Sequence, residues 1–304
     1  MRVLVTGSNG LVGKELCKRL AEKGVEVREF DLALGKDLLN KEHCDEAAKG
    51  VHAIVHLAAL LEESAGKQRL FEVNVQGTKN LVEAAMQQRV PRFVFLSTVG
   101  VMGNVKGKAS EETQIMPVTA YEQSKAEAEK IVMKCQEAIS VTVLRSALVL
   151  GPNAYWKSIF KLIEKGFPLI GNGKNKWQTI YYKDLVNAIV FVLEREQTEN
   201  ETFVISGEEA PSLKELAELI AKELQVNGEI KTVPIWQGKL LAAIMGIVYR
   251  LQGKKFFFSN EHIERLLRNR EYDLTKIHAY GWQSKTPLQI AVKETIEAIK
   301  QESR

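Results

Sequence analysis

The first 31 residues hold the pattern that most restricts the fold. The run "RVLVTG" (2–7) is short, rich in β-branched residues and closed by a glycine, which predicts a strand and a turn. The stretch "LVGKELCKRLAEKG" (11–24) follows with apolar residues at helical spacing, and "VEVREFD" (25–31) predicts a second strand. A strand, a helix and a second strand within about 30 residues are typical of the βαβ unit of a parallel sheet.

The turn between the first strand and the helix reads "TGSNGLVG" (6–13). Gly7 permits a tight turn, Gly10 lets the backbone approach a pyrophosphate, and Gly13 lets the helix pack close to the strand. Free N–H groups at the start of the helix bind phosphates. The turn therefore predicts a dinucleotide site, with cofactor contacts expected from Gly7, Asn9, Gly10, Leu11, Val12 and Gly13.

Asp31 ends the second predicted strand, 18 residues after Gly13. A carboxylate at this place can accept both ribose hydroxyls of an adenosine, and it repels a 2′-phosphate. Asp31 is therefore predicted to bind the cofactor and to favour NAD over NADP. Arg28 lies on the same strand, which weakens the predicted preference for NAD over NADP.

From residue 36 to 210, apolar strand-like runs alternate with helical patterns. The strands are continuously apolar, which indicates a parallel sheet covered on both faces. The sequence thus predicts an α/β fold, a Rossmann-type doubly wound parallel sheet with a smaller C-terminal substrate lobe. We expect residues 1–150, joined by a returning strand at 202–206, to form the NAD-binding domain, and residues 151–304 to form most of the substrate lobe, interleaved with it. The expected strands are 53–59, 92–98, 141–150 and 202–206, and the expected helices lie near 70–88, 120–138 and 183–196.

Ligands of open α/β sheets bind at the carboxyl ends of the strands. Leu57, Ala58 and Ala59 follow the third predicted strand, and the two small residues would let a cofactor lie against the backbone. His56 is predicted to be a packed residue at the end of that strand. Thr98 ends the next strand, close to the expected position of the nicotinamide.

Two segments place a tyrosine four residues before a lysine, "YEQSK" (121–125) and "YDLTK" (272–276). Residues four apart share one face of a helix. Tyr121 opens the helix that follows the strand of Thr98, so both members of the first pair would point toward the strand ends. The second pair lies outside the alternating pattern and is predicted to be structural. Thr98, Tyr121 and Lys125 are therefore the predicted catalytic residues.

The predicted chemistry needs all three side chains. Free tyrosine has a pKa of about 10, so it is a poor base at neutral pH. A nearby lysine ammonium and the positive nicotinamide ring favour the phenolate. Lys125 can also hold the ribose hydroxyls of the nicotinamide, so Tyr121 and Lys125 are expected to contact the cofactor as well. The Thr98 hydroxyl would orient the substrate oxygen while hydride leaves for NAD.

The glycine-rich turn, the strand-end threonine and the Tyr-x-x-x-Lys pair together resemble the extended short-chain dehydrogenase/reductase superfamily, commonly called the NAD-dependent epimerase/dehydratase family. The resemblance continues nearly to the C-terminus. It implies that Asp37 and Leu38 of "KDLLN" (36–40) contact the adenine and that Asn74 of "NVQGT" (74–78) lines the site. It also implies a homodimer paired through the helices near 70–88 and 120–138.

Departures from the family pattern restrict which of the family's reaction types this chain is expected to catalyse. Family members that dehydrate nucleotide sugars carry Asp-Glu directly after the catalytic threonine, whereas this chain has Val99 and Gly100. Nucleotide-sugar epimerases carry an arginine near position 177 that clamps the diphosphate. This chain has Trp177 beside Lys176, and a lysine does not fully replace the bidentate contacts of a guanidinium.

Three functions stay open at this point. The leading hypothesis is an NAD(H)-dependent oxidoreductase acting on a secondary alcohol or ketone. One alternative is a UDP-hexose type epimerase with tightly bound NAD, and another is a non-catalytic dinucleotide-binding protein. The apolar segment 233–258 resembles the branch that holds 3β-hydroxysteroid dehydrogenases, and contact of residues 239–258 with a membrane surface is an alternative to a core helix.

Composition bounds the partners. The net charge is only +4 and the basic residues are dispersed, so the expected ligand is a small molecule and not a nucleic acid. Cys17, Cys44 and Cys135 have no CxxC spacing, which predicts neither disulfide nor metal site and favours a reducing, cytoplasmic location. The N-terminus does not resemble a signal peptide, and the longest apolar stretch, at 239–251, is too short to span a bilayer.

Overall fold

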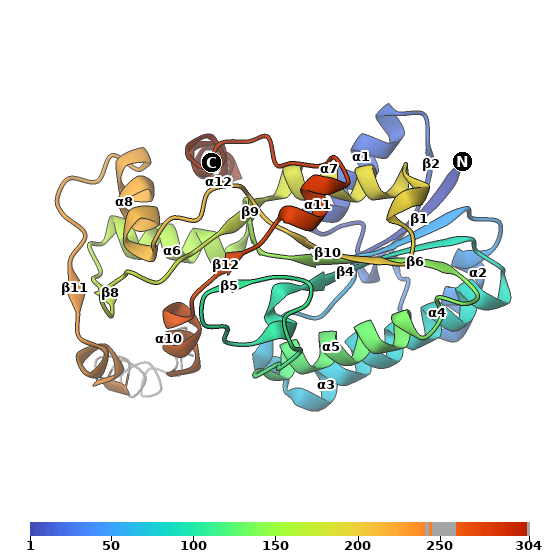
Figure 1. Cartoon of the computed structure of the whole chain (residues 1–304), viewed down its shortest axis with the longest axis horizontal. Helices are drawn as coiled ribbons and strands as arrows, with labels where there is room; N and C mark the ends of the chain where they lie inside the picture. Colours follow the sequence, from blue (N-terminus) through green and yellow to red (C-terminus); the bar gives the residue numbers. More distant parts are fainter. Residues whose placement is uncertain (241–242, 245–259, 303–304) are drawn as a thin grey trace.

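A computed structural model describes residues 1–240, 243–244 and 260–302 of the chain. Its central layer is a parallel six-stranded sheet in the order β10-β6-β4-β3-β1-β2 (Figure 1). The predicted α/β class and doubly wound parallel sheet are therefore confirmed. The strands are β1 (Arg2–Thr6), β2 (Glu26–Phe30), β3 (Ala53–His56), β4 (Arg92–Thr98), β6 (Ser140–Ser146) and β10 (Glu201–Ile205).

The strand order reverses beside β1. The chain first builds β2 on one side of β1, and it then returns to place β3 on the other side. The loops after β1 and β3 leave the sheet in opposite directions, which opens a crevice at the carboxyl end of these two strands. This crevice is where a dinucleotide binds in doubly wound folds.

Helices cover both faces of the sheet (Figure 1). One face carries α1 (Leu11–Glu22), α7 (Tyr182–Leu193) and the short α11 (Thr275–Ala279), and the other carries α2 (Lys41–Ala48), α4 (Gly77–Gln87) and α5 (Ala120–Met133). Alternate residues of β1 enter different cores: Val3 and Val5 belong to one and Leu4 to the other. This alternation explains why the strands are apolar throughout.

Several predicted elements have different bounds in the structure, including the strand expected at 53–59, which ends at His56. The strand expected at 141–150 is two strands, because the N–H of Ala147 pairs with Ile205 and β7 (Leu148–Leu150) then joins β9 (Thr179–Tyr181) in a separate sheet. The helix expected near 70–88 contains a π-helical turn, Glu72–Gln76, between α3 (Lys67–Phe71) and α4. The helix expected at 120–138 ends at Met133.

Beyond the sheet, a third apolar core joins α6 (Ala154–Glu164), α8 (Leu213–Glu223) and α12 (Leu288–Glu302), with Trp156 and Trp177 among its buried side chains. These helices gather at one end of the molecule (Figure 1). The division into two lobes at residue 150 stays a prediction. Short paired strands complete this region: β8 (Leu169–Ile170) with β11 (Thr232–Val233), and β5 (Lys108–Ala109) with β12 (Glu271–Tyr272), which follows α10 (Asn260–Leu267).

The segment for which membrane contact was considered, 239–258, lies mostly outside the described residues. Within the described ranges, none of the helices is long and apolar enough to cross a bilayer.

Candidate active site

The three glycines of the turn after β1 have different surroundings. Gly7 has a φ of +71°, and a Cβ at this position would lie 2.8 Å from the backbone nitrogen of Ala58. A Cβ on Gly13 would lie 2.1 Å from the carbonyl oxygen of Gly7. Gly10 is exposed, and the nearest atom to its Cβ position is the same oxygen at 3.3 Å. Gly7 and Gly13 thus bring the turn, β3 and α1 together, whereas Gly10 leaves an open face.

The start of α1 is suited to an anion. Gly10 is the residue that caps the helix, so no side chain accepts hydrogen bonds from the first amides. Leu11 and Val12 form the first turn and are half-buried. Uncapped amides and the positive end of the helix dipole fit a pyrophosphate placed over Gly10.

Asp31 and Arg28 have separate roles in the structure. The Asp31 carboxylate accepts hydrogen bonds from the backbone N–H groups of Asn9 and Ala33, both at 3.0 Å, and this fixes it beside the glycine-rich turn. Arg28 donates to three main-chain carbonyls of residues 46, 47 and 49, at 2.7 to 3.2 Å, and so caps the end of α2. Its guanidinium is thereby held away from a 2′-phosphate role, which removes the sequence argument against NAD.

Asp37 and Leu38 form a local turn in the loop after β2. The Asp37 carboxylate accepts the N–H of Leu39 at 2.9 Å, and the carbonyl of Leu38 accepts the side-chain amide of Asn80 at 2.9 Å. The buried Leu38 side chain leaves no space for a Cβ on Gly77, which would lie 2.9 Å away. These contacts fix the loop against α4, and adenine contact by Asp37 and Leu38 stays a prediction.

His56 is a packed residue, as predicted. Thr78 donates to the carbonyl of Asn74, so its oxygen accepts from Nε2–H of His56 at 2.9 Å. Nδ1 then accepts the hydroxyl of Thr6 at 2.7 Å, and Thr6 in turn accepts the N–H of Ala58. Burial, with a smaller effect of Lys125, lowers the pKa of His56 to about 3, so the ring is neutral and structural.

Asn74 lies in the π-helical turn and joins two parts of the site. Its side-chain oxygen accepts the N–H of Leu60 at 2.7 Å, and its amide donates to the Leu60 carbonyl and to Ser124. Ser124 donates onward to the carbonyl of Tyr121 at 2.7 Å. Asn74 therefore ties the segment that contains Leu57, Ala58 and Ala59 to α5.

Tyr121 is the second residue of α5, and three groups fix its surroundings. Thr119 and Glu122 form a reciprocal capping box at the start of the helix. The backbone N–H of Tyr121 donates to Glu63 at 3.3 Å. The Thr98 hydroxyl oxygen accepts the N–H of Gly100 at 3.1 Å, so its proton remains available for a substrate oxygen.

Lys125 is only 3% exposed and lies one turn after Tyr121 on the same helix. Its Nζ lies 4.1 Å from the ring centroid of Phe95 on β4. Burial lowers the pKa of Lys125 to about 7, and the carboxylate of Glu129 opposes this effect. Glu129 is itself held by Arg145 and by the hydroxyl of Ser97.

Burial raises the pKa of Tyr121 above its ordinary value, and the positive charge of Arg265 on α10 opposes this. Sequence reasoning missed Arg265, as it missed Arg268 and Glu63. The basic run "RLLRNR" (265–270) directly before "EYDLTK" was the available signal, but nothing in the sequence relates it to residue 121, about 145 positions earlier.

Trp177 occupies the position where the family pattern suggested a diphosphate-binding arginine. The side chain is 2% exposed, and its indole N–H donates to the Leu266 carbonyl at 3.1 Å. The guanidinium carbon of Arg270 lies 4.5 Å from the ring centroid. The second tyrosine–lysine pair is separated: Tyr272 is buried in β12, and Lys276 on α11 forms an ion pair with Glu201 at 2.7 Å.

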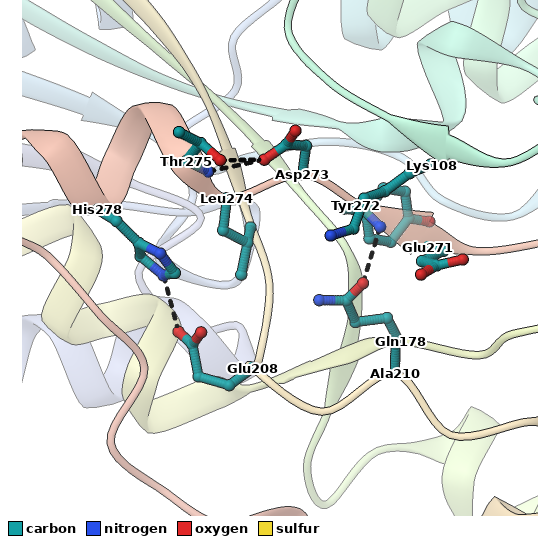
Figure 2. A pocket seen from close by; sticks show the side chains of 10 residues that line it. All are labelled: Lys108, Gln178, Glu208, Ala210, Glu271, Tyr272, Asp273, Leu274, Thr275 and His278. Atoms are coloured by element: carbon teal, nitrogen blue, oxygen red, sulfur yellow. Dashed lines mark hydrogen bonds and ion pairs between the residues drawn. The ribbon is translucent and has the colours of Figure 1, made fainter.

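A separate polar cavity of about 290 Å³ lies beside β12 and α11. Figure 2 shows Glu208 pointing toward His278, 3.1 Å away, and the Gln178 side chain accepting the main-chain N–H of Tyr272 at 2.8 Å. None of the predicted catalytic or cofactor residues lines it. The remaining lining residues are Lys108, Ala210, Glu271, Asp273, Leu274 and Thr275.

A nicotinamide dinucleotide fits the open Gly10 face and the fixed Asp31. Fold and site together place the chain among Rossmann-type enzymes that move hydride between a nicotinamide cofactor and a carbinol carbon. Its residues 3–206 match the model of the NAD dependent epimerase/dehydratase family, and the chain belongs to that family. NAD as cofactor and an enzyme of the extended short-chain dehydrogenase type are thereby confirmed.

The relatives of this chain include epimerases and hydroxysteroid dehydrogenases. The UDP-glucose 4-epimerase of Vibrio cholerae is 29% identical over 98% of this chain and 95% of its own length. The 3-beta-hydroxysteroid dehydrogenase of Mycolicibacterium neoaurum is 31% identical over 64% of this chain and 61% of its own length. A crystal structure of UDP-glucose 4-epimerase from Thermotoga maritima superposes with a TM-score of 0.80 at 22% identity, over 100% of both chains, which shows the shared fold.

Proposed function

We propose that the enzyme interconverts a secondary alcohol and its ketone with freely exchanging NAD(H), and that Tyr121 transfers the proton. Lys125 holds the nicotinamide ribose and tunes Tyr121, and Thr98 orients the substrate oxygen. The bound cofactor supplies the hydride acceptor or donor. The glycine-rich turn, Asp31 and residues 57–59 would hold it, with Asp37, Leu38 and Asn74 at the edges of its site.

The raised pKa of Tyr121 favours the reduction direction, in which Tyr121 donates a proton to the ketone oxygen. With its raised pKa, Tyr121 is protonated at neutral pH, which is the form that a ketone reduction consumes. In the oxidation direction, the phenolate must form before it can take the alcohol proton. The positive charge of Arg265 favours that phenolate, and the protonated form of Lys125 would favour it further.

The buried Trp177 is the observation that carries the choice of a dehydrogenase or reductase over a nucleotide-sugar epimerase. A side chain that is 2% exposed and bonded to Leu266 cannot clamp a diphosphate. Of the nearby arginines, Arg268 pairs with Glu122, and Arg270 stacks on Trp177 while donating to the Arg265 carbonyl.

A UDP-hexose type epimerase is the second candidate, and Arg265 favours it. The structure gives this guanidinium no ion pair or side-chain hydrogen bond to another described residue, and its charge reaches Tyr121 and Tyr155. An anionic group on the substrate would form an ion pair with the Arg265 guanidinium. The two epimerases that align with 97% or more of this chain support the same candidate.

One experiment separates the two candidates. The purified protein is denatured, the released nucleotide is identified, and UDP and UDP-glucose are titrated by calorimetry. An empty site, NADH formation at 340 nm from secondary alcohols and no UDP binding are expected for the dehydrogenase. Retained NAD with micromolar UDP binding would overturn it in favour of the epimerase. Tyr121→Phe serves as the catalytic control in either case.

We further propose a cytoplasmic homodimer that pairs through α4 and α5. The three cysteines form no disulfide, in keeping with a reducing compartment. The outward residues Lys79, Glu83 and Lys130 make these faces mixed and charged. Sedimentation equilibrium tests the dimer, and Glu83→Arg with Lys130→Glu should shift it toward monomer.

A further inference from the structure

The segment after α10 reaches across the molecule to the start of the helix that carries Tyr121. Nη1 of Arg268 donates to Oε1 of Glu122 at 2.6 Å. The two side chains are 11% and 6% exposed, so the pair is shielded from water. A shielded and hydrogen-bonded pair fixes geometry far better than an exposed one.

Glu122 directly follows Tyr121 and holds the first turn of α5. Its second oxygen, Oε2, accepts the backbone N–H groups of Val118 and Thr119 at 2.9 and 3.0 Å. The backbone N–H of Glu122 donates in turn to the Thr119 hydroxyl. The carboxylate therefore connects Arg268 to Val118 and Thr119, just before Tyr121.

Glu122 also packs against the turn that holds Thr98. A Cβ on Gly100 would lie 2.9 Å from Cγ of Glu122 and 3.3 Å from the hydroxyl oxygen of Thr98. There is thus no spare space between Glu122 and the Thr98 turn. A shift of Glu122 would move the Tyr121 backbone and disturb the position of Thr98.

The other end of the connection is anchored in the region of Trp177. Asn269 accepts the N–H of Lys176 at 2.9 Å and donates to the Gly107 carbonyl at 2.9 Å. The N–H of Arg270 donates to the Lys176 carbonyl at 2.8 Å. Residues 268–270 therefore join the segment of Lys176 and Trp177 to the start of α5.

We propose that Arg268 is a positioning residue that acts through Glu122 to hold Tyr121 and Thr98 in register with each other. This inference rests on the proposed role of Tyr121. On this proposal, turnover depends on the contacts of residues 268–270. Cofactor binding at the glycine-rich turn does not depend on them.

The test compares Arg268→Ala and Arg268→Lys with a matched control, Arg92→Ala. Arg92 also forms a partly buried ion pair, 2.7 Å from Glu199, but lies at the start of β4 and caps the end of α7. We expect Arg268→Ala to lower kcat on the order of 100-fold, because a misplacement of about 1 Å has such an effect. NAD affinity should change less than about twofold, because the cofactor contacts are elsewhere. Millimolar guanidinium should restore kcat to Arg268→Ala, and Arg268→Lys should be intermediate.

Arg92→Ala should lose thermal stability but keep kcat. If Tyr121→Phe abolishes turnover while Arg268→Ala keeps it, the positioning role is wrong and the proposed function stands. If Tyr121→Phe retains turnover, the proposed function itself fails. Hydrogen exchange of the NAD complex needs no substrate: protection of residues 119–124 should fall in Arg268→Ala only, and unchanged protection would overturn the proposal.

Discussion

Gly10 and Gly13 are three residues apart, yet the structure predicts opposite outcomes for adding one methyl group. A Cβ on Gly13 would lie 2.1 Å from the Gly7 carbonyl oxygen, far inside the 3.0 Å below which Cβ atoms are not found. Relief requires α1 to move off β1, at a cost of about 1–3 kcal/mol or more. At about 2–4 °C per kcal/mol for a chain of this size class, Gly13→Ala should lower the melting temperature of the cofactor-free enzyme by several degrees.

Gly10→Ala should leave that melting temperature nearly unchanged. The backbone of Gly10, with φ −72° and ψ 170°, is one that alanine adopts, and the nearest atom to the added methyl is 3.3 Å away. The change in stability should be under about 1 kcal/mol. The methyl would point into the space where the pyrophosphate meets the helix start, so NAD affinity should fall about 10- to 100-fold, or about 1.4–2.8 kcal/mol.

Differential scanning fluorimetry without cofactor and calorimetric titration of NAD measure both variants. In the fluorimetry, Gly10→Ala is the control for Gly13→Ala, since both change glycine to alanine at a negative φ but only Gly13 has backbone atoms closer than 3.0 Å to the added methyl. Wild-type NAD affinity in Gly10→Ala would refute the placement of the pyrophosphate. An unperturbed melting temperature in Gly13→Ala would refute the close packing of α1 on the turn.

Three further outcomes are expected. Tyr121→Phe should lower kcat by about 10²–10⁴-fold with NAD affinity retained, because only the transferred proton is lost; steady-state kinetics with calorimetry check this. Asp31→Ala should weaken NAD binding and raise the affinity for NADP relative to NAD, because the carboxylate that repels a 2′-phosphate is removed. Arg28 stays bound to α2, so the change in preference comes from Asp31 alone, and calorimetric titrations of both cofactors measure it. Lys125 binds no proton above a pKa of about 7 when folded but binds one up to about 10.5 when unfolded, so stability should rise with pH between 7 and 9. The slope is at most about 1.4 kcal/mol per pH unit, and Lys125→Met should flatten it in urea titrations.

The sequence predicted those parts of the site that depend on local geometry. A tight turn followed by a helix packed close to the strand needs glycine at defined positions. The roles of Gly7 and Gly13 could therefore be predicted from the sequence. The carboxyl ends of the strands could be located as well, because strands buried on both faces are apolar and polar residues first appear where they end. Tyr121 and Thr98 follow from that rule and helix spacing.

Features set by contacts between distant segments were not predictable. The break between β6 and β7 arises because Ala147 pairs with Ile205, about 60 residues later in the chain. Arg28 looked like a possible phosphate ligand until its guanidinium was found on the carbonyls of α2. Arg268 is 146 residues from Glu122, and no periodicity connects them.

The two central ionisable groups of the site are shifted in opposite directions by one cause. Burial raises the pKa of Tyr121 and lowers that of Lys125 to about 7, because in each case the charged form loses its hydration. Without cofactor, Tyr121 is therefore a neutral phenol, and Lys125, one turn further along α5, is close to losing its proton. In such a poorly hydrated place a positive charge acts strongly, because little water screens it. The positive ring of oxidised NAD would favour the phenolate most where Tyr121 is hardest to ionise alone. If Tyr121 transfers the proton as proposed, its burial would make the redox state of the cofactor decide whether it donates or accepts that proton.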